Sequence, residues 1–185
     1  GRFGFYQAFC GGQYHDDEIA DGLGSDWCVP GVFYKPYPAN HFTHAGIDAA
    51  LKLRDRVRID EIDYIELGVA SPTLRTIAQP AEEKARPQSG YHAQFSGPFT
   101  VATALIGGSG LGVGLDDFTD QRVHDQRYLD LAAKVHCVAS PECDAIFPNQ
   151  FPAVLTIRTS DGRSFEERVL ANRGGPGNPL SPAEL

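Results

Sequence analysis

The chain has 185 residues, of which 42% are hydrophobic and 10% aromatic, which is enough for one folded domain and excludes a disordered polypeptide. Its formal net charge is −8 and it lacks a Lys/Arg-rich run, so we expect no nucleic-acid partner. No apolar run approaches the ~20 residues that span a bilayer, and no signal-peptide pattern opens the chain, so we expect no membrane partner.

The first third of the sequence predicts helices and strands around a loop. The aromatic residues within 2–9 favour a short helix, and the Gly- and Asp-rich residues 11–26 are typical of a loop. Residues 29–37 predict a strand, and an apolar stripe over 43–56 predicts an amphipathic helix. Alternating apolar residues then predict a strand over 62–69.

The middle third is less regular. Residues 71–92 contain three prolines and a charged run, which predict a long irregular segment of the kind that forms lids or binding loops. Ser96 is expected to cap a helix that ends at Gly107 and Gly108. A helix over 127–134 and a strand over 135–138 follow.

The last third carries a strong hairpin signal. Two alternating runs, 153–159 and 164–170, flank the turn Ser160-Asp161-Gly162-Arg163. Strands at both ends with helices between them predict an α+β fold, in which an antiparallel sheet has helices packed on one face.

The segment from Lys35 to His44 combines a lysine, two histidines and an asparagine with two prolines. Proline fixes φ, so we expect a rigid extended segment that brings Lys35 to a helix N-terminus, a setting suited to an anionic small molecule. An ordinary solvated loop is the plainer interpretation of the same residue types.

Two other motifs leave alternatives open. Residues 91–96 end the irregular segment, so Ser96 and the free amides after it can face a ligand, although simple N-capping explains this serine equally well. The glycine run 107–114 does not spell GxGxxG and lacks the GKS/T ending of a phosphate loop, so we expect a flexible connector.

The remaining patterns argue against metal chemistry. The four cysteines form no CxxC pair, and the histidine and acidic residues show neither HExxH nor EF-hand spacing. We therefore expect no metal, and four reduced thiols in a cytoplasmic protein.

The chain ends look like those of a fragment. The sequence contains no methionine, and Ser181, Pro182 and Glu184 form the capping pattern of a helix that should continue past Leu185. We expect a piece of a longer polypeptide.

Several ordered blocks together resemble the MmgE/PrpD family. Lys35-Pro36-Tyr37-Pro38-Ala39 with Thr43-His44 and Ile47-Asp48-Ala49-Ala50 is similar to the family block KPYPA…TH…IDAA, and Ala93-Gln94-Phe95-Ser96-Gly97-Pro98-Phe99 is similar to AQFS-x-P-Y. The opening around Gly4-Phe5 and the closing Asn178-Pro179-Leu180-Ser181 also resemble family landmarks.

The resemblance implies both architecture and chemistry. Members include 2-methylcitrate dehydratases, cis-aconitate decarboxylases and iminodisuccinate epimerases, which act on small polycarboxylates without metal or organic cofactor. They are commonly homodimers, with a large helical domain, a smaller α+β domain and an active site between the two. The implied organisation here is a flank over 1–28, the small domain over 29–172 and a returning linker over 173–185, with the N-terminal helical domain absent.

Site residues follow by position in these motifs. Lys35 matches an active-site lysine and is the implied catalytic residue, while Asn40, His44 and Ser96 are the implied substrate-binding residues. His44 matches a recurrent family histidine, for which capping or orienting the helix start is the plainer role. Asn40 stands where similar decarboxylases have histidine, and Phe99 where much of the family has tyrosine, which puts decarboxylation in doubt.

The expected function is therefore one wall of a dehydratase-like or epimerase-like active site, whose general base lies in the absent domain, so that this chain alone has no turnover. The alternative is a non-catalytic α+β binding or assembly module.

Overall fold

A computed structural model describes residues 2–184. The chain divides into two compact units, the first reaching Val32 and the second beginning at Phe33. The first unit contains the short helices α1 (Phe5–Phe9) and α2 (Asp16–Ala20) and a 3-10 turn at Val29–Gly31. The helix predicted within 2–9 is confirmed. The loop predicted over 11–26 is wrong in part, because three acidic residues in the first turn of α2 favour a helix N-terminus there.

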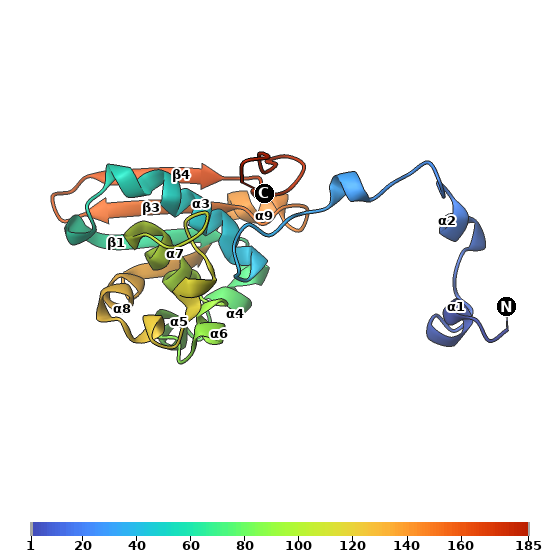
Figure 1. Ribbon diagram of the computed structural model, residues 1–185, viewed down its shortest axis with the longest axis horizontal. Helices are drawn as coiled ribbons and strands as arrows, with labels where there is room; N and C mark the ends of the chain where they lie inside the picture. Colours follow the sequence, from blue (N-terminus) through green and yellow to red (C-terminus); the bar gives the residue numbers. More distant parts are fainter. Residues whose placement is uncertain (1, 185) are drawn as a thin grey trace. The chain divides into compact units, whose positions relative to one another are not determined.

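The second unit holds the remaining elements (Figure 1). Its helices are α3 (His44–Leu53), α4 (Leu74–Ile77), α5 (Ala81–Ala85), α6 (Gly90–Ala93), α7 (Gly97–Ile106), α8 (Gln126–Ala132) and α9 (Pro141–Ile146). Its strands are β1 (Ile62–Val69), β2 (Val135–Ala139), β3 (Ala153–Thr159) and β4 (Ser164–Val169). Short 3-10 turns occupy 41–43, 54–56, 59–61, 71–73, 115–118 and 122–124.

The four strands form one sheet in the order β2-β1-β3-β4. β3 pairs antiparallel with both β1 and β4, as predicted, but β1 and β2 run parallel, so the sheet is mixed. The long connection between them permits this pairing, because a parallel pair needs a crossover and α4 to α8 fill the chain between the end of β1 and the start of β2.

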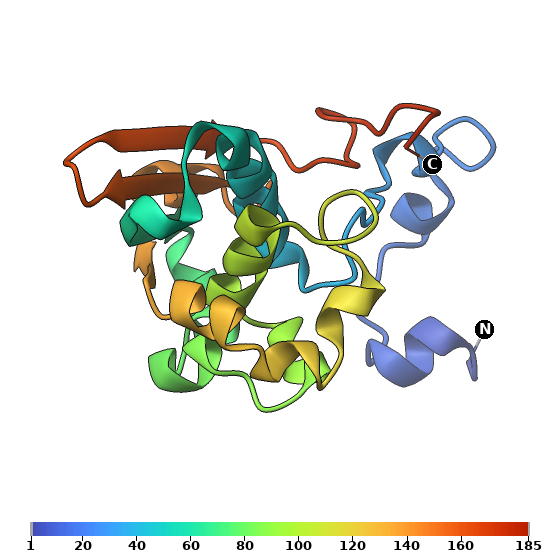
Figure 2. The ribbon, with the colours of Figure 1, turned by 60° about the vertical axis from the view of Figure 1, so that its left-hand side comes forward.

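Helices α3 and α7 lie side by side against one face of the sheet (Figures 1 and 2). The β1 residues Ile65, Leu67 and Val69 point to this face and are at most 1% exposed. A Cβ at Gly46 of α3 or at Gly97 of α7 would lie 3.0 or 3.3 Å from the Leu67 methyl groups. These two glycines therefore let both helices approach the central strand closely, and the predicted α+β class is confirmed.

The hairpin between β3 and β4 forms as predicted. Gly162 has φ +87°, which favours glycine, and the Asp161 carboxylate accepts a 2.6 Å hydrogen bond from the Thr159 hydroxyl. These local contacts set the register in which Ile157 faces Phe165.

The strand predicted over 29–37 is wrong. After the 3-10 turn the chain is extended, but its partner is a loop: the Tyr34 N–H donates to the Gly174 oxygen at 2.9 Å. Pro30, Pro36 and Pro38 have no N–H to give to a strand ladder, which explains the absence of sheet pairing here.

The long irregular segment predicted over 71–92 is also wrong in part, because α4, α5 and α6 lie within it. Its prolines separate these helices rather than prevent them: Pro80 is the N-cap of α5. Helix α9 is a helix that the sequence reasoning missed, although Pro141 stands in its first turn, where proline is tolerated.

The capping box predicted at the chain end is present in part, because the Glu184 N–H donates to the Ser181 backbone oxygen at 3.0 Å and not to the Ser181 hydroxyl. The Glu184 carboxylate accepts hydrogen bonds from the Ser181 N–H at 2.7 Å and from the Ser181 hydroxyl at 2.6 Å. Leu185, where the predicted helix would continue, lies outside the described residues.

Candidate functional site

The residues 33–40, which we call the Lys35 segment, present an exposed amine on a rigid backbone. Pro36 and Pro38 restrict φ on either side of Tyr37, whose side chain is 1% exposed and anchors the segment in the core. The Asn40 N–H donates to the Gln94 oxygen at 2.8 Å, which joins the segment to the turn before α7. Lys35 itself is exposed.

Two hollows flank Lys35. The first, the asparagine hollow, has a volume of about 480 Å³ and is lined by Lys35, Pro38, Ala39, Asn40, Tyr91, Gln94 and Phe95. The second, the glycine hollow, has a volume of about 420 Å³ and is lined by residues 35–38 together with Gly110, Leu111, Val113, Gly114 and Leu115. Within residues 2–184, no carboxylate pairs with the Lys35 ammonium, so its charge is free to meet an anion.

The two polar groups of the Asn40 side chain differ in their partners at the edge of the asparagine hollow. Its Oδ1 accepts from the Phe42 N–H at 3.0 Å and so caps the 3-10 turn that leads into α3. This leaves the amide NH2 group as the donor available to a ligand.

Ser96 lies next to this hollow, but it is fully buried. Its hydroxyl donates to the Lys84 oxygen at 2.5 Å and accepts from the Phe99 N–H at 2.9 Å. The predicted N-cap is confirmed. Because both of its hydrogen bonds stay within the protein, the geometry gives Ser96 a role in holding the turn rather than in touching a ligand.

Lys84 is a residue that the sequence reasoning missed. Its side chain is 93% buried by area, since only 7% is exposed, and its ammonium donates to the Phe95 oxygen at 2.9 Å. Burial lowers the pKa of this amine. Lys84 therefore stabilises the turn at Phe95 and Ser96 through these hydrogen bonds. In the sequence, nothing in the charged run around Lys84 distinguishes it from an ordinary surface lysine.

The two histidines do not reach the hollows. His44 is fully buried, its Nε2 lies 3.2 Å from the Ala39 oxygen, and burial lowers its pKa to about 3. Burial, and next the charge of Lys35, lower the pKa of His41, whose ring packs between Phe33 and Phe151. Both imidazoles are neutral at neutral pH, and His44 supports the backbone of the Lys35 segment.

A buried polar cluster lies beneath the Lys35 segment. The Tyr37 hydroxyl donates to Asp48 Oδ1 at 2.5 Å and accepts from Arg173 Nη1 at 2.8 Å. Burial is the main cause that raises the pKa of both Tyr37 and Asp48. The Arg173 guanidinium also pairs with Glu184.

The glycine run folds as a loop around a buried carboxylate, while its flexibility stays a prediction. The Asp117 carboxylate is 1% exposed, and its Oδ2 accepts from the N–H groups of Ser109 at 2.7 Å and Gly114 at 2.8 Å. Positive φ angles at Gly107, Gly110 and Gly112 let the backbone wrap around this carboxylate. The loop thus forms one wall of the glycine hollow.

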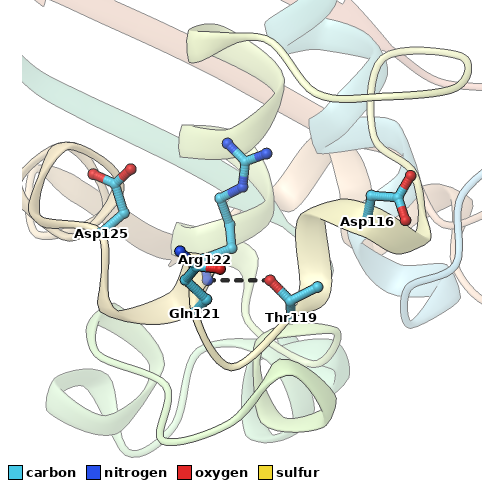
Figure 3. A pocket seen from close by; sticks show the side chains of 5 residues that line it. All are labelled: Asp116, Thr119, Gln121, Arg122 and Asp125. Carbon is cyan, nitrogen blue, oxygen red and sulfur yellow. Dashed lines mark hydrogen bonds between the residues drawn. The ribbon is translucent and has the colours of Figure 1, made fainter.

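A third hollow, of about 360 Å³, is lined by Asp116, Thr119, Gln121, Arg122 and Asp125 (Figure 3). Its only cation among these lining residues is Arg122, which donates to the Tyr128 hydroxyl at 2.5 Å and lies 3.6 Å from Asp117. Because this guanidinium is already engaged, the Lys35 hollows are the better candidates for an anion.

A family model decides the kinship of the chain: the MmgE/PrpD C-terminal domain matches residues 37–185. The chain belongs to the MmgE/PrpD C-terminal domain family. In a comparison with curated proteins, none matches it. The family resemblance drawn from the sequence blocks is thereby confirmed, and Lys35 itself lies just before the first matched residue, Tyr37.

The two departures from the MmgE/PrpD motifs have different surroundings. Asn40, where the resemblance implies histidine in similar decarboxylases, lines a hollow that a ligand can reach. Phe99, where the resemblance implies tyrosine in much of the family, is fully buried in the core, with its ring 6.1 Å from that of Tyr128.

Two kinds of feature are missing from the described part of the chain. No three histidine, cysteine or acidic side chains among residues 2–184 gather as metal ligands would. Within the same residues, no helix combines the length and apolar character needed to cross a membrane.

Proposed function

We propose that this MmgE/PrpD C-terminal domain forms one wall of the active site of a cofactor-independent lyase or isomerase that acts on a small polycarboxylate. The observation that carries the proposal is the Lys35 ammonium, exposed and without a carboxylate partner among residues 2–184, between two hollows. A cation in this position suits a carboxylate, and two hollows leave room for an anion with several carboxylate groups.

In the proposed reaction, a base removes a proton from the carbon next to a substrate carboxylate. The electron pair moves toward that carboxylate, and the nearby Lys35 ammonium stabilises the growing negative charge. In a dehydratase the C–O bond then breaks and a C=C bond forms. The leaving hydroxide takes up a proton and departs as water. In an epimerase the same carbon is reprotonated on its other face.

The general base is proposed to come from another domain. The residues lining the asparagine hollow offer a lysine, a tyrosine and two amides, but neither a carboxylate nor an imidazole. Asn40 hydrogen-bonds a carboxylate but does not accept a proton at neutral pH. An N-terminal helical domain, of the kind implied by the family resemblance, would supply this base and cover the hollows. A homodimer and a cytoplasmic location belong to the same proposal.

The decisive test compares Lys35→Ala with Lys52→Ala in the longer polypeptide that we propose carries this domain. Lys52 is a matched control because it is an exposed lysine paired with Glu167 at 2.9 Å and lines neither Lys35 hollow. Turnover of citrate-like and methylcitrate-like substrates is followed by formation of the C=C bond, and proton abstraction by deuterium uptake from D2O.

We expect Lys35→Ala to lower turnover by about 10²-fold or more, the scale of losing a charge-stabilising group, while Lys52→Ala leaves it unchanged. We also expect the 185-residue chain alone to give no turnover. Full activity of Lys35→Ala would instead support the second candidate, a non-catalytic binding module, which the amide at Asn40 favours. Turnover by the 185-residue chain alone would contradict the proposed origin of the base.

A further inference from the structure

We propose that Arg173, acting through the Tyr37 hydroxyl, is a positioning residue for the Lys35 amine. The inference rests on the proposed function of Lys35 as the group that holds an anion. It adds a role for a residue near the end of the chain that the sequence motifs did not single out.

The hydrogen bonds of the Tyr37 hydroxyl fix its direction. A phenol hydroxyl has one proton, which is given to Asp48 at 2.5 Å, so the contact with Arg173 at 2.8 Å uses its oxygen as the acceptor. Arg173 Nη1 also lies 3.8 Å from the same Asp48 oxygen, and the guanidinium carbon lies 6.0 Å from the centre of the Tyr37 ring. Tyr37 is 1% exposed and Asp48 6% exposed, so these bonds are shielded from water.

The cluster acts on Lys35 because the backbone between them is stiff. Tyr37 lies two residues after Lys35 and is enclosed by Pro36 and Pro38, which restrict φ on both sides. Holding the Tyr37 ring therefore holds the backbone that carries the amine.

The chain around Arg173 also touches the Lys35 segment on its other side. The Tyr34 N–H donates to the Gly174 oxygen at 2.9 Å. A Cβ at Gly174 would lie 2.3 Å from the Tyr34 backbone oxygen, so this approach requires glycine there. One at Gly175 would lie 2.4 Å from the Phe33 ring, which would have to shift. Lys35 is thus held before and after by contacts with residues 173–175.

Arg173 lines neither of the two hollows that contain Lys35. It lies instead at a separate hollow with Asp48, Lys52 and Asn178. Its removal should therefore weaken anion binding only through the position of Lys35.

The test uses the whole 185-residue chain and citrate as the probe. Reductive methylation with ¹³C labels the lysine amines and keeps their charge. The chain contains four lysines, so the NMR spectrum has few methyl signals. The signal that disappears in Lys35→Arg belongs to Lys35. Citrate titration then reports affinity at Lys35. The ¹⁵N heteronuclear relaxation of the Lys35 and Tyr37 amides reports the rigidity of the segment without any ligand.

We expect Tyr37→Phe and Arg173→Met each to weaken citrate binding about fivefold, the effect of losing one ordinary hydrogen bond. Both variants should make the Lys35 backbone amide more mobile. The double variant should bind citrate no less tightly than the single variant with the lower affinity, since the two residues act in one chain of contacts. Arg173→Lys should restore part of the affinity. Tyr64→Phe and Arg168→Met are matched controls. The Tyr64 hydroxyl contacts Glu66 and the Arg168 guanidinium contacts Glu142, and neither residue lines a Lys35 hollow.

The outcomes separate this inference from the proposed function. If Lys35→Met binds citrate like the original chain, or if the original chain gives no citrate-dependent shift at Lys35, the proposed function fails. If Lys35→Met weakens binding while Tyr37→Phe and Arg173→Met leave both affinity and amide relaxation unchanged, the positioning role fails alone. If Arg173→Met does not fold, the comparison of Tyr37→Phe with Arg173→Lys tests the positioning role instead, because Tyr37→Phe keeps the buried ring.

Discussion

Replacing Asp117 by alanine should destabilise the chain and loosen the glycine loop beside Lys35. In the structure one oxygen of this carboxylate accepts hydrogen bonds from the backbone N–H groups of Ser109 and Gly114 and from the Ser109 hydroxyl. The variant leaves both N–H groups without an acceptor in a region that is only partly open to water.

The magnitude follows from those two N–H groups. A buried donor left without an acceptor costs about 1–3 kcal/mol, and the Ser109 and Gly114 bonds are only partly buried, so we expect a loss of about 2–4 kcal/mol in the free energy of unfolding. The lost contact to Arg122, at 3.6 Å and partly exposed, adds little. Such a loss is a large share of the roughly 5–15 kcal/mol of a typical domain.

Urea denaturation followed by circular dichroism measures this loss, and hydrogen exchange at the Gly114 amide reports the loop itself. Asp116→Ala is the matched control, because the neighbouring carboxylate is exposed and its removal should change stability by less than about 0.5 kcal/mol. A loss below about 1 kcal/mol for Asp117→Ala, with unchanged exchange at Gly114, would refute the view that this carboxylate organises the loop.

Three further predictions concern groups with defined surroundings. His44 has a pKa of about 3 when folded, below its ordinary 6.5, so the unfolded chain binds a proton first as the pH falls. The free energy of unfolding should therefore fall from pH 6.5 toward pH 3 by up to about 1.4 kcal/mol per unit, and His44→Gln but not the exposed His136→Gln should flatten this slope. Ser96→Ala should lower the free energy of unfolding by about 1–3 kcal/mol and leave citrate affinity of the folded chain unchanged; a selective loss of citrate binding would contradict its structural role. Gly174→Ala and Gly162→Ala both place alanine at positive φ, at 91° and 87°, but only the first Cβ meets a backbone oxygen, at 2.3 Å. Thermal denaturation should show Gly174→Ala to be the worse by at least about 1 kcal/mol, and equal losses would speak against the close approach.

The candidate site was only partly predictable from the sequence. Lys35 could be singled out because it stands among prolines in a recognisable block, and the cap at Ser96 follows from residue type and spacing alone. Whether a hydroxyl is buried depends on what packs over it, and Ser96 is covered by the carbonyl of Lys84, which lies in a helix that the sequence reasoning did not expect. The same applies to the buried amine of Lys84, which looks like a surface group in the sequence.

The sequence by itself determined those features whose causes lie within a few residues. The turn at Asp161 and Gly162, the alternation of β1 and the cap of α7 all depend on local hydrogen bonds and on side-chain period. Only the tertiary structure decided the parallel pairing of β1 with β2, the wrapping of the glycine loop around Asp117 and the contact between Tyr37 and Arg173, which lie 136 residues apart. Such contacts form between segments that are brought together by packing of the whole core, so no local pattern encodes them.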